Sequence, residues 1–478
     1  MFTLLEGVET TAFFRRTDAP VFDPLVVVII DNETCDRYFE FMPLTLVALA
    51  IPLSVYIWHF SLFSMYVVDF PRSDDFWLLQ PPLLEKWPPW SWFWEQYLEH
   101  RYAVLKAISW LLYRLGNRDF LLIQYFGFLT FGILVASIVW IHKKRNMDWR
   151  VASVFSAFLV SPLLIENHVW AVLISIHLCY LFFFWGAHFL HDPASSQVGW
   201  KKRLLGIALL FLAAASDANA VPLCLVLGLG TFAIEAARGR WKAAVLWSIL
   251  TVLPAVIYLI GYRGVRPYPY AMPWDERLWI YFKSQAQAVF WYVKLAPSWR
   301  GILATLLVLA APIVWLVRRR AKLNSQEWFE LLMYACTLAT LFAVAMSRAT
   351  NDSEIHVRYC EYSVMLLPWL MVIWFRALGA DKRAAVILCL FFLFQLRLHK
   401  NPELQRFYQY YHQGRVMTLD CIHKQLAERR PEIYCTYYAS SAVYGGMPER
   451  FTEVLVMAKK LGFSFTEKLD LDYLRDKK

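Results

Sequence analysis

The sequence predicts an all-α polytopic membrane protein with about eleven transmembrane helices. Of its 478 residues, 59% are hydrophobic and only 18% are charged, and the mean hydropathy is +0.40. A soluble globular protein of ordinary composition does not reach these values. Apolar runs of roughly bilayer-crossing length recur along the chain, and short basic clusters recur between them.

The first 41 residues precede the predicted spans. They contain no secretory signal, because Glu6 and Glu9 come before Arg15 and Arg16, and the apolar run at 25–30 is too short for one. We expect residues 1–41 to form a cytoplasmic N-terminal extension.

The apolar runs and the basic clusters together predict the topology. The runs lie at about 42–68, 119–141, 151–165, 169–190, 203–216, 219–236, 241–262, 301–317, 328–347, 361–378 and 383–398. With eleven spans, the basic clusters fall in every second loop, as expected of cytoplasmic loops; they lie at 143–145, 201–203, 238–242, 318–322 and 382–383. The N-terminus is then inside and the C-terminus outside. Topology also explains the formal net charge of +10 without a nucleic-acid partner.

The remaining polar segments fall on the exterior face in this topology. They are the loop 69–118, the segment 166–168, Asp217 with Asn219, and the stretches 263–300 and 347–359. The polar chain at 399–478 is expected to form a small exterior soluble domain. It contains Cys421 and Cys435, and the sequence leaves open whether they form a disulfide.

The exterior loop 69–118 carries a predicted interfacial helix. Prolines break the chain up to Pro89, and helical periodicity begins near Ser91. Glu95, Glu99 and Lys106 gather on a different side from the apolar residues, so we expect the carboxylates to face out of the lipid. An ordinary surface helix with a solvated charged face is the alternative.

Two adjacent carboxylates, Asp74 and Asp75, follow the first predicted span. At a membrane exit they can act as a general base toward a hydroxyl or hold a divalent cation, since hard cations prefer oxygen ligands. The alternative is a solvated turn in which Ser73 and Asp74 cap the following segment.

Polar residues elsewhere on the exterior face leave similar choices open. Arg348 and Arg358 bracket the loop before Tyr359, where a guanidinium can grip a lipid phosphate or snorkel to ordinary headgroups. Asp217 lies between two short apolar runs, where a site and a wet turn explain it equally well. His177 lies within a span without an acidic neighbour in sequence, so core packing is expected.

Several segments carry a resemblance to a known family. They are SDDFWLL at 73–79, WEQYLEHRYAVLK at 94–106, ENHVW at 166–170 and SRATNDSEIHVRY at 347–359. Their arrangement after spans and in exterior loops resembles the GT-C superfamily of polytopic glycosyltransferases, in particular an uncharacterised bacterial group. The chain departs from the D-x-D pattern of oligosaccharyltransferases because its two acids are adjacent, so metal dependence stays open.

The resemblance implies a transmembrane glycosyltransferase domain at 42–398 in the bacterial cytoplasmic (inner) membrane. Such an enzyme moves a sugar from a polyprenyl-phosphate donor to a cell-envelope glycan or lipid acceptor. The implied catalytic residues are Asp74 or Asp75 as base, with Glu99 and His100 positioning acceptor or base. The implied substrate-binding residues are Arg101, Asn167, His168, Arg348, Arg358 and Tyr359. Asp74 and Asp75 are the expected ligands if a divalent cation is used.

Other classes of function remain alternatives. A transporter or flippase for a lipid-linked glycan would use its carboxylates as a relay at membrane depth. Here the acids cluster in an exterior loop, which favours an enzyme. Another membrane transferase, for acyl or phosphoethanolamine groups, would need a nucleophilic hydroxyl or a membrane-embedded histidine with a charged partner.

Overall fold

The computed structural model confirms the all-α fold class. It describes residues 32–71, 75, 78–97, 100–116, 118–161, 165–191, 199–263, 270–291, 299–319, 324–350, 357–399, 404–430, 435 and 448–471. These residues form helices and no strand, with one isolated β-bridge between Tyr97 and His100. The chain divides into two units, Met1–Leu46 and Val47–Lys478. Nearly all of the helical structure belongs to the second unit.

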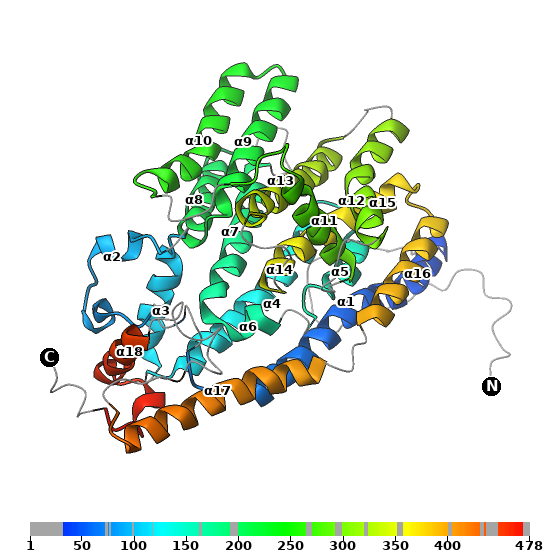
Figure 1. The fold of residues 1–478 in the computed structure, drawn as a ribbon. Coiled ribbons are helices and arrows are strands. Elements are labelled where there is room, and N and C mark those ends of the chain that lie inside the picture. The colour runs from blue at the N-terminus through cyan, green and yellow to red at the C-terminus, as the bar shows by residue number, and fades with distance from the viewer. Residues whose placement is uncertain are drawn as a thin grey trace, which may run out of the picture. The chain divides into compact units, whose positions relative to one another are not determined.

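Figure 1 shows the helices of the chain in order. In order they are α1 (Asn32–Tyr66), η2 (Pro81–Leu84), α2 (Trp90–Trp94), α3 (Ala103–Leu115), α4 (Phe120–Lys144), α5 (Trp149–Ser156), α6 (Ile165–Val169), η4 (Ala171–Leu173), α7 (Ile174–Leu190), α8 (Trp200–Ser216), α9 (Ala220–Ala237), α10 (Trp241–Leu259), α11 (Glu276–Trp291), α12 (Trp299–Arg318), α13 (Ser325–Arg348), α14 (Val357–Met365), α15 (Leu367–Ala377), α16 (Lys382–His399), α17 (Leu404–Ala427), α18 (Pro448–Leu461) and η6 (Ser464–Thr466).

Within the described residues, eight segments are helical, long and apolar enough to cross a membrane. They are Thr45–Tyr66, Phe120–Lys144, Ala171–Leu190, Ala220–Ala237, Trp241–Leu259, Trp299–Arg318, Ser325–Arg348 and Tyr359–Ala377. The protein is therefore a multi-pass membrane protein. Each of these segments coincides with one of the predicted apolar runs.

The other three predicted spans have a different form. The run at 151–165 is broken, because α5 ends at Ser156 and a buried turn follows at 157–161. Irregular backbone at membrane depth is tolerated where protein covers it, and residues 157–161 are buried. The runs at 203–216 and 383–398 form α8, of 17 residues, and α16, of 18 residues. The prediction of eleven crossings requires that these three segments also cross the membrane, and it stays a prediction.

Ends of many helices meet at one face, here called the basic end. The Arg145 guanidinium, after α4, donates to the carbonyl of His191 after α7 at 2.5 and 2.6 Å. His191 contacts Thr231 of α9 through a 3.0 Å hydrogen bond. Near the end of α9, Glu235 pairs with Arg203 at 2.9 Å and Arg240 at 2.8 Å. Residues of the predicted basic loops therefore gather at one end of the helices.

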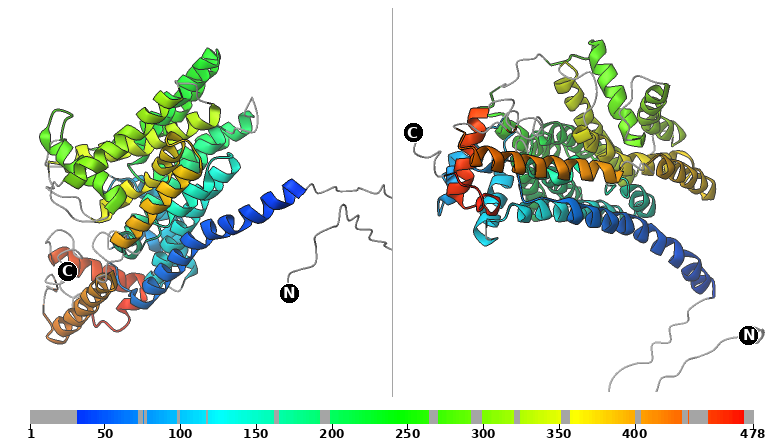
Figure 2. Two further views of the ribbon diagram at one scale, coloured as in Figure 1. Left: turned by 90° about the vertical axis from the view of Figure 1, so that its right-hand side faces the viewer. Right: turned by 60° about the horizontal axis from the view of Figure 1, so that its bottom comes forward.

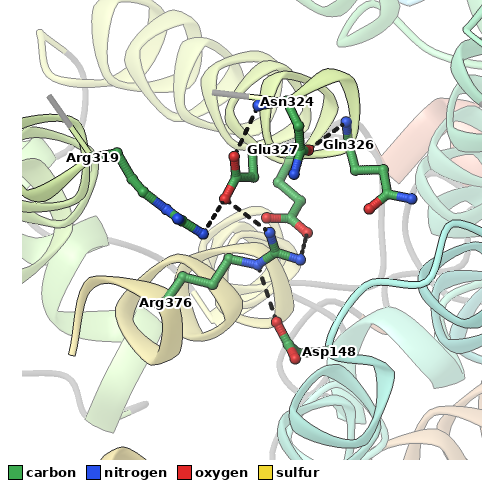
Figure 3. Close-up of polar contacts among 7 residues, drawn as sticks. Asp148, Arg319, Asn324, Gln326, Glu327 and Arg376 are labelled. Atoms are coloured by element: carbon green, nitrogen blue, oxygen red, sulfur yellow. Dashed lines mark hydrogen bonds and ion pairs between the residues drawn. The ribbon is translucent and has the colours of Figure 1, made fainter. Parts of the chain in front are cut away.

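An ionic network centred on Arg376 extends the basic end (Figure 3). Arg376, in the last turn of α15, pairs with Asp148 at 3.0 Å, Glu327 at 3.4 Å and Glu330 at 2.8 Å. Arg319 also pairs with Glu327, at 2.7 Å. The side chains of Glu327 and Glu330 are buried, so their charges depend on these arginines for compensation.

The C-terminal helices pack against the loop 69–118. The Tyr113 hydroxyl of α3 donates to the Leu461 carbonyl of α18 at 2.6 Å, and Ser464 donates to the Asp69 carboxylate at 2.5 Å. Buried side chains of both segments belong to one apolar cluster, and Figures 1 and 2 show α18 beside α3 from several directions. A disulfide joins Cys421 and Cys435, the pairing that the sequence left open. The boundary at 399 stays a prediction.

The helix predicted to begin near Ser91 is interrupted. The chain forms α2, leaves it at Glu95 and begins again as α3 at Ala103. Lys106, expected on a solvated face, is only 1% exposed. Its ammonium donates to the Trp92 carbonyl and to the Glu95 carbonyl at 3.3 Å. It thereby donates to carbonyl groups of the last turn and the C-cap of α2.

Because Lys106 is buried, we expect the free energy of unfolding to increase with pH in the alkaline range. Burial lowers the pKa of Lys106 to about 8, although the Glu95 carboxylate acts to raise it. The folded protein then releases a proton above pH 8, while the unfolded chain keeps it to about pH 10. Relative to Lys106→Met, the wild type should gain roughly 2 kcal/mol between those values. Melting temperatures of both proteins from pH 7.5 to 10 check this, and a constant difference would contradict it.

Candidate functional site

A cavity of about 150 Å³ lies at the ends of the helices opposite the basic end, and we call it the site cavity. It is bounded by the start of α9, the end of α13 and the start of α14. The opposite ends of α9 and α13 carry Glu235 and Glu327, and α15, which follows α14, carries Arg376; these three residues belong to the basic end. Its lining is His100, Ala218, Asn219, Pro222, Tyr262, Tyr270, Ala343, Val344, Ser347, Arg348, Tyr359 and Tyr362. Most of the segments predicted to be exterior thus contribute side chains to one cavity.

The cavity wall contains a histidine paired with a buried carboxylate. Nδ1 of His100 lies 3.3 Å from Oδ2 of Asp217, which is 1% exposed. Ser175 donates to the same oxygen at 3.1 Å, and the Asn219 amide nitrogen of the backbone donates to Oδ1 at 3.0 Å. Burial by itself raises the pKa of Asp217, but the pairing with His100 and these Asn219 contacts outweigh it and hold the pKa below its ordinary value. Asp217 therefore stays ionised beside His100.

Local backbone structure positions His100. Its amide and carbonyl both pair with Tyr97, at 2.9 and 2.8 Å. Its ring stacks on Tyr102 with centroids 5.2 Å apart and an interplanar angle of 11°. The imidazole is 17% exposed, so it is held in place and still reaches the cavity.

Arg348 supplies a cation to the same cavity. It ends α13, and its guanidinium lies over the Tyr359 ring, 4.8 Å from the centroid. Tyr262, Tyr270 and Tyr362 also line the cavity. A histidine on a carboxylate, a guanidinium and aromatic rings suit a polar ligand that carries negative charge and hydroxyl groups.

Arg101 lies beside the cavity without lining it. Its guanidinium donates to the carbonyls of Trp94 at 2.8 Å, Tyr258 at 3.1 Å and Ile260 at 2.8 Å. These bonds connect the turn at 95–102 with the end of α10. A role of Arg101 in binding phosphate stays a prediction.

Asp75 is fully buried and accepts a hydrogen bond from the Val172 amide at 2.8 Å, at the start of η4. It does not line the site cavity. Asp74, Glu99 and the side chain of Arg358 lie outside the described residues. The part of the chain that the structure describes contains no group of three His, Cys, Asp or Glu side chains arranged for a metal ion. The catalytic and metal-binding roles of the acid pair stay a prediction.

Asn167 and His168 belong to a buried polar cluster in the helix interior. Asn167 donates to Oε2 of Glu361, and Nε2 of His177 contacts Oε1 of the same carboxylate. The His168 ring packs 4.3 Å from Phe131 and 5.5 Å from His177, measured between centroids. Glu361 stands between Tyr359 and Tyr362 in sequence, so the cluster anchors the helix that forms one cavity wall.

Two of these polar residues have partners from distant parts of the chain. The sequence predicts core packing for His177 because it lacks an acidic neighbour along the chain, yet Glu361 from α14 pairs with it. The sequence leaves the role of Asp217 undecided, and its partner is His100 from the loop 69–118. Placing a carboxylate between two apolar runs is energetically unfavourable, and this feature of the sequence identified Asp217. It did not identify the partner of Asp217.

No protein-family model, no curated protein and no solved structure matches this chain.

Proposed function

We propose that this protein is a membrane glycosyltransferase that moves a sugar from a polyprenyl-phosphate donor to a glycan or lipid acceptor of the cell envelope. One observation carries the proposal: His100, paired with Asp217, shares the site cavity with Arg348. Two of the segments that resemble GT-C enzymes, 94–106 and 347–359, contribute His100, Arg348 and Tyr359 to this cavity, which lies at an end of membrane-spanning helices. A donor anchored in the bilayer can reach such a place without leaving the membrane.

The cavity offers the groups that this transfer needs. The acceptor hydroxyl oxygen forms a bond to the anomeric carbon, and the bond from that carbon to the phosphate oxygen breaks. His100 takes the hydroxyl proton on Nε2, because Nδ1 faces Asp217, whose charge stabilises the resulting imidazolium. The phosphate leaves with the bonding electron pair, and Arg348 stabilises its charge. This proposal gives His100 the role of base, while Asp74 or Asp75 in that role stays a prediction.

We place the site cavity on the exterior face of the bacterial inner membrane, with the N-terminus inside and the C-terminus outside. The basic end, which gathers the lysine and arginine clusters, is then cytoplasmic. The disulfide between Cys421 and Cys435 supports this orientation, since disulfides persist in oxidising compartments.

The test is a comparison of cells with and without the protein. Mass spectrometry of envelope glycans and of lipid-linked intermediates should show one glycan lacking a sugar and one lipid-linked sugar accumulating in the deletion strain. Identical glycans and lipids in both strains would refute the proposal. The accumulated lipid then serves as the donor for assays with purified protein.

We expect Arg348→Ala to slow consumption of that donor about 10²- to 10³-fold, because one charge stabiliser of the leaving phosphate is removed. Arg348→Lys should restore part of the rate. Arg263→Ala is the matched control, because Arg263 is exposed and does not line the cavity. Equal rates for Arg348→Ala and the control would remove Arg348 from the mechanism.

A transporter for a lipid-linked glycan is the second candidate. The buried pair of His177 and Glu361 favours it, because ionisable groups within spans often form relays. Detergent-solubilised protein decides between the two functions. A glycosyltransferase consumes donor in micelles, whereas a transporter needs two separated compartments.

A further inference from the structure

An apolar groove of about 520 Å³ runs between α1, α4 and α5, away from the site cavity. Along α4 it reaches from Leu129 to Lys143, which corresponds to roughly 21 Å of helix. Its walls are almost entirely aliphatic or aromatic, and Lys143 stands at the mouth. The groove therefore starts at the basic end and extends toward the middle of the membrane.

The groove has fixed walls at both ends. Toward the membrane centre, the Tyr56 hydroxyl donates to the Phe128 carbonyl at 3.1 Å, and a Cβ on Gly132 would meet that hydroxyl at 2.7 Å. At the other end, Ser153 donates to the Ala48 carbonyl at 2.7 Å. These contacts hold α1 against α4 and α5, and they therefore fix the width of the groove between the three helices.

Two lysine ammonium groups lie over tryptophan rings at the mouth of the groove. The Lys143 ammonium lies 5.6 Å from the centroid of Trp149, and the Lys144 ammonium lies 5.4 Å from that of Trp140. Both tryptophans line the groove, and both lysines are exposed. Within the described part of the chain, neither lysine pairs with a carboxylate, and the nearby Asp148 is held by Arg376. The mouth thus presents unneutralised positive charge above an apolar slot.

We propose that this groove binds a phospholipid with an anionic headgroup. Its acyl chains lie along Gly132 and Ala136, and its phosphate lies between Lys143 and Lys144. Tryptophan and lysine together suit the headgroup level of a bilayer. The groove accommodates chains that end near the membrane centre, as those of diacyl lipids do, and a polyprenyl chain is too long for it.

The test is lipid binding by the purified full-length protein, measured by native mass spectrometry. The probes are phosphatidylglycerol and phosphatidylethanolamine with the same acyl chains. We expect the anionic lipid to bind more tightly. Lys143→Gln with Lys144→Gln should weaken its binding roughly 30-fold, since each cation near an anionic surface contributes about a factor of five. The pair Lys201→Gln with Lys202→Gln is the control, because Lys201 also lies over a tryptophan but does not line this groove.

A second variant separates the groove from the charge. Ala136→Trp fills the slot from an exposed position and should abolish specific binding, whereas Ala208→Trp, exposed on α8, should not. Equal binding of the two phospholipids, equal loss in the controls, or displacement of phosphatidylglycerol by a lower concentration of polyprenyl phosphate would overturn the proposal. The readout requires no glycosyl transfer, so it stands or falls independently of the proposed activity.

Discussion

Replacing His100 by glutamine is expected to slow glycosyl transfer about 10²- to 10⁴-fold, the usual contribution of a general base. The amount of inserted protein should be unchanged, because Asp217 keeps its hydrogen bonds from Ser175 and Asn219, and the backbone pairing of residue 100 with Tyr97 does not depend on the side chain. The measurement is the rate of donor consumption by purified protein. His423→Gln is the control, since His423 is exposed on α17 and does not line the cavity.

The same assay distinguishes His100 from the acid pair. Full activity of His100→Gln, together with loss of activity in Asp74→Asn or Asp75→Asn, would return the role of base to the loop after the first span. Asp75→Asn needs a folding check, because its carboxylate accepts a hydrogen bond from the Val172 amide in a buried position.

Replacing Arg376 by methionine is expected to destabilise the protein by about 3 to 5 kcal/mol, since it leaves buried carboxylates without their counter-charge. Glu330 is fully buried, and it forms an ion pair with Arg376 at 2.8 Å. Glu327 keeps Arg319, so Glu330 carries most of the penalty. The loss is measured as a lower melting temperature in detergent and a lower yield of folded protein.

A second substitution tests this cause. Glu330→Gln in the Arg376→Met background should recover much of the stability, because it removes the buried carboxyl group that has lost its ion-pair partner. Arg383→Met, at an exposed position early in α16, should have little effect. If Glu330→Gln brings no recovery, the arginine stabilises the basic end by packing and not by charge compensation.

The fold class was predictable because membrane spans are local features. Eight apolar runs became helices of spanning length, since within lipid the backbone must satisfy its hydrogen bonds inside each segment. The broken run at 151–165 was less predictable, because a buried turn is allowed only where neighbouring helices cover it. The break between α2 and α3 was missed because apolar periodicity continued across it.

Several residues of the candidate site were predictable from the sequence, but their hydrogen-bond and ion-pair partners were not. His100, Arg348 and Tyr359 were expected to contribute to a site and line the same cavity. The prediction for Lys106 was wrong because charge usually indicates exposure, and the carbonyl groups that it satisfies belong to another helix. No local pattern signals such a partner.

The sequence by itself determined that the chain is an α-helical membrane protein, where most of its helices run, and that its basic loops alternate with its other polar loops. These properties follow from hydropathy and charge, which act residue by residue. Only the tertiary structure decided that His100 meets Asp217, that His177 meets Glu361 and that Lys106 is buried. Those pairings depend on how helices distant in sequence pack, and a buried charge is stable only when that packing brings it a partner.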